Sequence, residues 1–465
     1  MFSKSIKTSF IGPLSFYKKA LSIALPVILQ LLVQSLVSLI DNFMVSGLGN
    51  VIYSSINVSN QLNMIIFVLL NSICAAGGIY ISQFNGIKNA EGMQHAYRFK
   101  IIFTLLIATI YTFITYFFSE NLMGFMLKDN LNKQEIVVEG SKYMKIIAFT
   151  WIPIALSFSI GSSMRESENV KTPLIISVIA TLINTVLNWI FIYGNLGAPR
   201  LEVKGAAIAT LCARLIELFI YLIYCYTKKP LFFSKWLKIF AIKASFCIEI
   251  LKKSFLVIIA NLSWILTETI MNRIHNGRGG AEIVAGLSAA WSIANLFQLV
   301  ISGMDVSTAV VIGGTLGRGE LDLAKKQSLW MKSCAIIVGT WLGFMTFFSS
   351  VLLPIVFPKI SSEAIVIAKQ MLFVIALYMP IWTFLNTQFA TARAGGDAML
   401  GTVTDLSVNT ILFLPGILLL GKYTTWSPVI LFAVVKISDI AKLIVAEWQL
   451  KKERWIKNLT TNQEV

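Results

Sequence analysis

Long apolar runs follow one another along nearly the whole chain, and they limit the possible folds more than any other feature of the sequence. A helix that crosses a bilayer needs about 20 mostly apolar residues. About twelve runs reach that length when the chain is cut at charges and at Gly, Pro and Asn clusters. The predicted spans are 20–46, 52–83, 100–119, 143–164, 173–194, 205–226, 254–276, 283–315, 333–356, 364–391, 398–420 and 427–450. We therefore expect an all-α integral membrane protein with twelve transmembrane helices.

The charges are few and unevenly placed. Only 13% of the residues are charged, about half of what soluble domains carry. The chain has 39 Lys and Arg residues and 23 Asp and Glu residues. By our count, about 25 of the basic residues fall in the loops on one side and roughly eight in the loops on the other. The positive-inside rule places that side, with both termini, in the cytoplasm of a cell (inner) membrane protein. The excess of positive charge is thus a topology signal that also favours binding to anionic lipid. We expect no nucleic acid partner.

Metal and catalytic signatures are weak. The five cysteines are scattered without a CxxC pair, and the chain has two histidines, His95 and His275. Neither a Gly-rich phosphate loop nor a Ser-His arrangement stands out. We expect no enzyme activity, no cofactor and no disulfide.

The chain divides near its middle. Residues 227–253 are basic and interleave Lys with Phe232, Phe233, Trp236, Phe240 and Phe246, a composition typical of a helix lying in the membrane interface. We interpret this stretch as a basic amphipathic cytoplasmic linker between bundles at 1–226 and 254–465.

The two halves also resemble each other at an offset near 230. Asn42 and Gly47 match Asn272 and Gly277, and Arg165 before the fifth span pairs with Arg393 before the eleventh. Six spans per half make this a parallel repeat, which is typical of transporters built from two bundles around a central site. We expect two pseudo-symmetric six-helix bundles.

Polar residues inside the first six spans predict an ion site. Asn184 and Asn188 lie one helical turn apart, roughly 17 and 22 Å from the cytoplasmic end of their span. Asp41 lies toward the outer end of span one, and Thr210 lies in the outer half of span six. Their oxygens suit a proton or a hard cation such as sodium, with Asp41, Asn184 and Asn188 as the metal ligands. The alternative is that Asp41 caps a helix at the water boundary.

Pro26 lies in the same span, fifteen residues before Asp41. A proline inside a spanning helix removes one backbone hydrogen bond and favours a kink. A bend at Pro26 could couple the protonation of Asp41 to helix movement, or it could be static.

The second half has acids of its own. Glu268 and Asp305 each fall roughly 20 Å from the cytoplasmic face, and no basic residue stands at helical spacing within the membrane, the nearest being Arg273. A carboxylate buried without a partner could bind and release protons near neutral pH. Both are candidates for a second-bundle acid or a substrate counter-charge.

Two further pairs have the spacing of ion pairs on one helix. Lys436 and Asp439 stand three residues apart in the last span, and Arg214 and Glu217 do so in span six. We interpret both as structural pairs that neutralise each other.

Several segments resemble the multidrug and toxic-compound extrusion (MATE) transporters over nearly the whole chain. They are LPVILQLLVQSLVSLIDNFMVSGLG (25–49), NTVLNWIFIYGNLG (184–197), VKGAAIATLCAR (203–214) and ARAGGDAM (392–399). The resemblance implies two six-helix bundles in a V around a central cavity, and export of organic cations in exchange for sodium or protons. It also carries the family's first-bundle cation site onto Asp41, Asn184, Asn188 and Thr210.

The chain departs from the family pattern in places. Some members have an aspartate where Asn188 stands, and Glu268 sits about one turn nearer the following glycines than the glutamate of the sodium-coupled branch. The region that matches a span-ten aspartate offers Thr383, Asn386 and Gln388 instead. Asp305 stands where the family usually has a small residue.

Together these features predict a monomeric secondary antiporter that exports amphipathic, mostly cationic compounds and uses Na⁺ or H⁺ as coupling ion. The alternative is a flippase for a lipid-linked oligosaccharide or another amphipathic lipid. A pyrophosphate head group would need several cavity cations, and the spans offer chiefly Arg214, Arg273 and Lys436.

Overall fold

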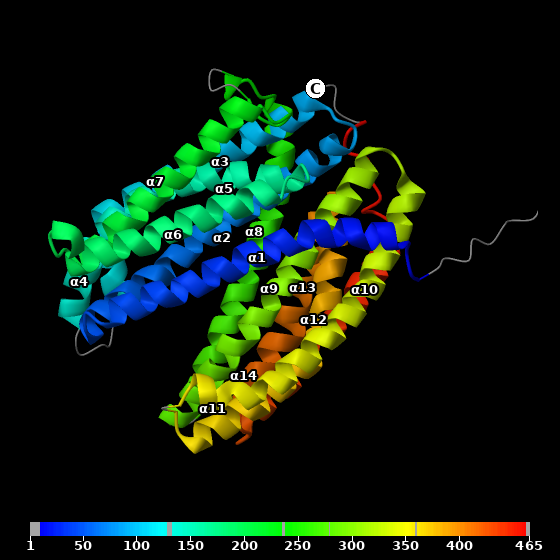
Figure 1. Ribbon diagram of the computed structural model, residues 1–465. Helices are drawn as coiled ribbons and strands as arrows, with labels where there is room; N and C mark the ends of the chain where they lie inside the picture. Colours follow the sequence, from blue (N-terminus) through cyan, green and yellow to red (C-terminus); the bar gives the residue numbers. More distant parts are fainter. Residues whose placement is uncertain (1–9, 128–132, 235–237, 279, 359, 462–465) are drawn as a thin grey trace, which may run out of the picture. The chain divides into compact units, whose positions relative to one another are not determined.

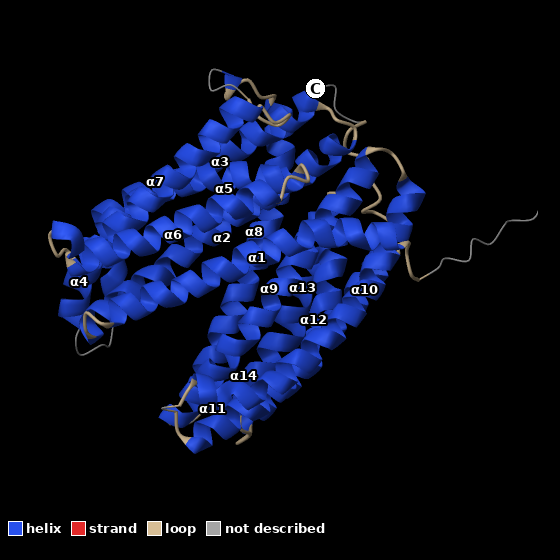
Figure 2. Cartoon of the chain, in the orientation of Figure 1, coloured by secondary structure: helices blue, strands red, loops and turns tan. Residues whose placement is uncertain are grey.

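The computed structural model describes residues 10–127, 133–234, 238–278, 280–358 and 360–461, which form helices joined by loops and no strand (Figures 1 and 2). The α-helices are α1 (Leu14–Ser46), α2 (Asn50–Gly86), α3 (Ala90–Met126), α4 (Lys133–Ile147), α5 (Trp151–Glu166), α6 (Lys171–Tyr193), α7 (Glu202–Lys228), α8 (Ala244–Asn276), α9 (Ala281–Gly317), α10 (Leu321–Phe348), α11 (Leu353–Val356), α12 (Ser362–Ala394), α13 (Ala398–Val408), α14 (Leu414–Tyr423), α15 (Pro428–Val435) and α16 (Ser438–Leu450).

Within the described residues, eleven helical segments are long and apolar enough to cross a bilayer. Some combine two of the helices above, such as Lys133–Glu166, which joins α4 and α5, and Ala398–Tyr423, which joins α13 and α14 through a π-helix at Asn409–Phe413. This confirms the prediction of an all-α, multi-pass membrane protein.

The predicted twelfth span, 427–450, is two short helices, α15 and α16. The hydrogen-bond ladder tightens between them, because Ile437 N–H donates to Val434 O at 3.2 Å and Asp439 N–H to Lys436 O at 2.9 Å. Bonds to the residue three positions back, in place of four, are those of a 3₁₀ turn. The break therefore falls at Lys436, a buried lysine.

Helix lengths repeat between the halves of the chain. α1 and α8 are 33 residues each, and α2 and α9 are 37 residues each. The equal lengths agree with the internal repeat seen in the sequence.

The chain forms two compact units. The N-terminal unit comprises Leu29–Ser254, and the C-terminal unit comprises residues up to Ile28 together with those from Phe255 onward. The division assigns the first part of α1, which the sequence places with the first bundle, to the C-terminal unit. α1 itself continues through Pro26 as one helix, and the predicted coupling of a bend there to Asp41 stays a prediction.

The linker predicted at 227–253 differs from expectation. The described residues between Lys228 and Ala244 form no α-helix, and those from Ala244 onward open α8, while Trp236 lies outside the described residues. Arg98 of α3 holds the segment, donating to Ser234 Oγ at 2.9 Å and to the carbonyl oxygen of Ala241 at 2.6 Å. Arg98 thus satisfies one backbone carbonyl and one hydroxyl of a segment that has no helical hydrogen-bond ladder.

An arginine closes the α14–α15 connection of the C-terminal unit. The Arg278 guanidinium donates to the carbonyl oxygens of Leu420, Gly421, Thr424 and Trp426 at 2.6 to 2.9 Å. Leu420 and Gly421 belong to the last turn of α14, where backbone carbonyls run out of helical partners, and Leu420 O also accepts from Thr424 N–H at 3.1 Å.

We expect Arg278→Ala to lower the free energy of unfolding by about 2–3 kcal/mol, because several carbonyls lose a charged donor at once. Thermal unfolding of the detergent-solubilised protein measures the change. Arg273→Ala is the matched control, since Arg273 is exposed and lies near the end of α8. Equal losses in the two variants would contradict the proposed capping role.

Candidate cation-binding site

Four polar side chains from α1, α6 and α7 form one hydrogen-bonded chain in the N-terminal unit. Asn188 Nδ2 lies 2.9 Å from Asp41 Oδ1 and 3.4 Å from Asn184 Oδ1. Asn184 Nδ2 lies 3.5 Å from Thr210 Oγ1, whose hydroxyl donates to Ala206 O at 3.0 Å. The structure thus brings together the four residues that helical depth placed near one level. Their role in ion coupling stays a prediction.

Close packing of α6 on α7 positions Asn184 beside Thr210. Gly205 faces the Phe191 backbone so closely that a Cβ atom at this position would overlap the Phe191 carbonyl oxygen. Leu201 N–H also donates to that oxygen at 2.9 Å. Small residues at such contacts are the usual way for membrane helices to approach each other.

Two hydrogen bonds hold α1 against α6 on either side of Asp41. Gln34 Nε2 donates to Ser177 Oγ at 2.9 Å, and the Tyr193 hydroxyl donates to Met44 O at 2.8 Å. These contacts fix the register of the two helices, so Asp41 lies opposite Asn188.

The cluster has acceptor capacity that the protein does not use. Asn188 is 3% exposed, and its Oδ1 has no hydrogen-bond partner among the residues that the structure describes. Asp41 is half-buried and makes no ion pair within the described part of the chain, because Arg214 pairs with Glu217 at 2.8 Å. A buried acceptor without a donor is costly. If the Asn188 amide turns its oxygen toward Asp41, a cation or a proton between the two side chains would satisfy both oxygens. Such oxygen ligands suit sodium.

The expectation that Glu268 and Asp305 lack basic partners is wrong. Lys436 Nζ donates to Glu268 Oε1 at 2.7 Å, and Arg393 forms an ion pair with Asp305. Both partners come from helices far along the chain, which spacing within one helix cannot reveal. These acids therefore differ from Asp41, since each has a counter-charge from the protein itself.

The two pairs predicted on single helices have different outcomes. Arg214 and Glu217 form the predicted pair. Lys436 instead pairs with Glu268, while Asp439 lies 3.5 Å from Lys442 Nζ. The prediction for Lys436 and Asp439 is wrong because the helix breaks between them.

Three polar side chains stand in the region that matches a span-ten aspartate. They donate hydrogen bonds to nearby backbone or to α16. Thr383 donates to Met379 O at 2.7 Å and Asn386 to Trp382 O at 2.9 Å. Gln388 Nε2 donates to Glu447 Oε2 at 2.7 Å. They act as helix and interhelix contacts in this structure.

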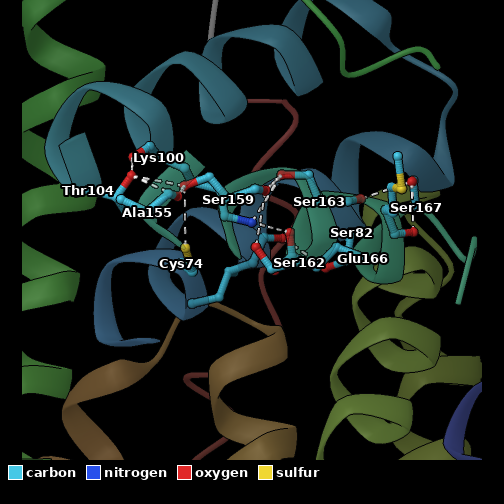
Figure 3. A network of polar contacts seen from close by, with 12 residues as sticks. Cys74, Ser82, Lys100, Thr104, Ala155, Ser159, Ser162, Ser163, Glu166 and Ser167 are labelled. Carbon is cyan, nitrogen blue, oxygen red and sulfur yellow. Dashed lines mark hydrogen bonds and ion pairs between the residues drawn. The ribbon is translucent and has the colours of Figure 1, made fainter. Parts of the chain in front are cut away.

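A buried ion pair in the N-terminal unit was missed by sequence reasoning. Lys100 of α3 donates to Glu166 Oε2 of α5 at 2.5 Å and to Ser163 Oγ at 3.2 Å (Figure 3). The network continues from Ser159 to Thr104 at 2.9 Å. The span predicted at 100–119 begins at Lys100, whereas α3 begins ten residues earlier at Ala90. Glu166 lies on another helix, 66 residues from Lys100, and helical spacing cannot reveal such a partner.

The sequence model of the MatE family matches residues 26–190 and 257–418. These stretches cover well over half of the chain, and they start 231 residues apart, close to the repeat offset. The chain belongs to the MATE family. This confirms the resemblance and makes the protein a member of a family of membrane transporters.

Among the curated relatives of this MATE protein is a probable multidrug resistance protein NorM of Haemophilus ducreyi. It is 23% identical over 367 residues, which are 77% of each chain. The probable multidrug resistance protein YoeA of Bacillus subtilis is 22% identical over 76% of this chain and 75% of its own.

Solved structures share the fold of this MATE chain. A MOP superfamily transporter from Pyrococcus furiosus superposes with a TM-score of 0.83 at 18% identity, covering 98% of this chain and 100% of its own. A mutant of the MATE transporter VcmN of Vibrio cholerae gives 0.83 at 16% identity, covering 95% and 98%.

The family match covers some site residues and leaves out others. Asp41, Asn184 and Asn188 fall in the first MATE stretch, and Glu268 falls in the second. Lys436, the partner of Glu268, lies beyond both stretches.

Proposed function

We propose that the chain is a secondary antiporter that exports amphipathic, mostly cationic compounds in exchange for sodium ions or protons. Relatives named as multidrug resistance proteins support the export of such compounds. It would act in the cell membrane as a monomer without a cofactor, with both termini in the cytoplasm, as the loop charges favour.

The observation that carries this proposal is the chain Asp41–Asn188–Asn184–Thr210 with its unpaired Asn188 oxygen. A carboxylate at membrane depth without a fixed cation is costly unless a mobile one binds it. Asp41 has that character, whereas Glu268 and Asp305 have internal partners.

Coupling requires that the ion and the substrate favour different states of the protein. A ligand shifts an equilibrium only by its difference in affinity for the two states. Loading Asp41 changes its contact with Asn188, which joins α1 to α6. We propose that this contact differs between the states that release ion and substrate.

The test is ethidium efflux from vesicles that contain the purified protein. An imposed sodium gradient and a pH jump are applied separately, with protein-free vesicles as the control. Acceleration by either gradient supports antiport and names the ion. An efflux rate that responds to neither gradient contradicts antiport. Binding of lipid-linked sugar in place of dyes would support the alternative function as a flippase.

We expect Asn188→Leu to weaken the apparent affinity for the coupling ion by roughly 10-fold or more, because it removes one ligand oxygen and the donor to Asp41. The measurement is the ion concentration that gives half-maximal efflux. Thr185→Val on the same helix is the matched control, since the Thr185 hydroxyl donates to the backbone of its own helix, at Thr181 O, at 3.2 Å. An unchanged half-maximal concentration in Asn188→Leu would remove Asn188 from the site.

A further inference from the structure

Among the described residues of the C-terminal unit, two carboxylates share one lysine. Lys442 Nζ is shared, at 3.1 Å from Asp405 Oδ1 and 3.5 Å from Asp439 Oδ1. The Lys442 contacts and the two pairs Lys436–Glu268 and Arg393–Asp305 together form one set of charges. It contains four carboxylates and three cations. The set carries a net charge of −1. Asp439 is buried and the other three carboxylates are partly exposed. Because an unbalanced charge in a membrane-spanning unit is costly, one further monovalent cation would stabilise the set.

One of these cations occupies surroundings suited to an organic ammonium group. Lys436 Nζ lies 5.4 Å from the ring centroid of Phe413, 5.7 Å from that of Phe432 and 6.0 Å from that of Trp382. On another side it contacts Glu268 Oε1 at 2.7 Å. Aromatic rings with one carboxylate are the usual recognition chemistry for alkylammonium ions. The side chain of Lys436 is itself an alkylammonium.

The Trp382 ring of this site is held in place. It stacks on Trp291 at a centroid distance of 6.3 Å and on Tyr378 at 5.9 Å. Its Nε1 donates to Asp439 Oδ2 at 2.9 Å. An aromatic wall fixed in this way costs little to organise when a cation binds.

Lys436 also has an alternative partner. It lies at the break between α15 and α16, so its side chain is not carried on a continuous helix. Asp439 follows three residues later and shares Lys442 with Asp405. A Lys436 side chain displaced from Glu268 would therefore move toward a carboxylate that is only partly neutralised.

We propose that Glu268 and the rings of Phe413, Phe432 and Trp382 form an ammonium-binding site that Lys436 occupies as a tethered competitor. An amine-bearing substrate displaces Lys436 toward Asp439, and the added positive charge brings the set from −1 to neutral. The inference rests on the proposed function for the identity of its ligand, and it specifies a monocation as the substrate class.

The first test replaces the tethered cation with a free one. In Lys436→Ala, n-butylammonium chloride should raise the thermal unfolding temperature, and sodium chloride at equal concentration should not. Lys442→Ala is the matched control, because Lys442 is another buried lysine of the same region that contacts carboxylates. Lys436→Ala combined with Glu268→Gln should not respond. A similar butylammonium response in both lysine variants, or in neither, overturns the proposal.

The second test measures displacement at equilibrium in detergent. Lys436→Met should bind ethidium at least tenfold more tightly than the unmodified protein, because the competitor is gone, and Lys436→Met with Glu268→Gln should lose that gain. The double variant removes both charges together, so it controls for misfolding caused by an unpaired Glu268. Unchanged or weaker binding in folded Lys436→Met overturns the proposal.

Neither test uses an ion gradient. A protein that passes both and yet shows no ion-driven efflux would contradict the proposed antiport and leave the ammonium site standing. A protein that shows ion-driven efflux and fails both tests would contradict the ammonium site alone.

Discussion

Asp41→Asn is expected to slow ion-driven efflux by roughly 10- to 100-fold, the range of coupling free energies between linked sites. Asparagine keeps the size and the hydrogen-bonding capacity of the side chain and removes the charge that attracts a sodium ion or a proton. Asn188 Nδ2, which now donates to Asp41 Oδ1 at 2.9 Å, could still donate to the new amide oxygen. The fold should therefore survive while coupling is lost.

The measurement is the initial rate of ethidium efflux under an imposed gradient, with thermal unfolding as the check on folding. Asp322→Asn is the matched control, because Asp322 is an exposed acid in the first turn of α10. A gradient response that persists in Asp41→Asn at the unmodified rate would contradict the proposed role of Asp41.

Lys100→Met should lower the free energy of unfolding by about 3–5 kcal/mol, because it leaves Glu166 without the cation that binds it in the interior. Lys100 is fully buried and lies 2.5 Å from Glu166 Oε2. Gly77 and Gly78 of α2 leave the space that the two side chains fill, since a Cβ atom on either would overlap them.

The double variant Lys100→Met, Glu166→Gln should recover most of that loss, because it removes both charges together. Lys145→Met is the surface control: Lys145 pairs with Glu120 at 3.3 Å, and both side chains are substantially exposed. Such a pair contributes at most about 1 kcal/mol. Thermal unfolding in detergent compares the three variants, and similar losses in Lys100→Met and Lys145→Met would show that the buried pair has no special role.

The N-terminal site could be predicted because its information is local. Asn184 and Asn188 share one helix face at a spacing of four residues, and distance along each helix set the approximate depth of Asp41 and Thr210. The hydrogen bonds among them agree with that construction. Apolar run length likewise predicted nearly all the helices, since a bilayer leaves few alternatives for a long apolar segment.

The charges of the C-terminal unit could not be predicted in the same way. Glu268 and Lys436 are 168 residues apart, and Asp305 and Arg393 are 88 apart. Helical spacing identifies partners within one helix only, so both acids looked unpaired. The break at Lys436 was hidden as well, because an apolar run gives no sign of where its backbone ladder changes.

The start of α3 was misjudged for a related reason. Its first eleven residues include His95, Arg98 and Lys100, which look like the end of a loop in the sequence, yet all three are buried. Arg98 and Lys100 meet partners on other segments, Ser234 and Glu166. Burial of that kind depends on contacts between distant residues, which hydropathy does not record.

Equilibrium binding of the coupling ion tests the central claim most directly. Purified protein in detergent is titrated with radioactive sodium, and proton release on ethidium addition is followed with a pH indicator. The unmodified protein should bind one sodium ion or release one proton per chain, and Asp41→Asn should do neither. The same ion stoichiometry in Asp41→Asn and in the unmodified protein would contradict the account, because the ion would then bind somewhere other than Asp41.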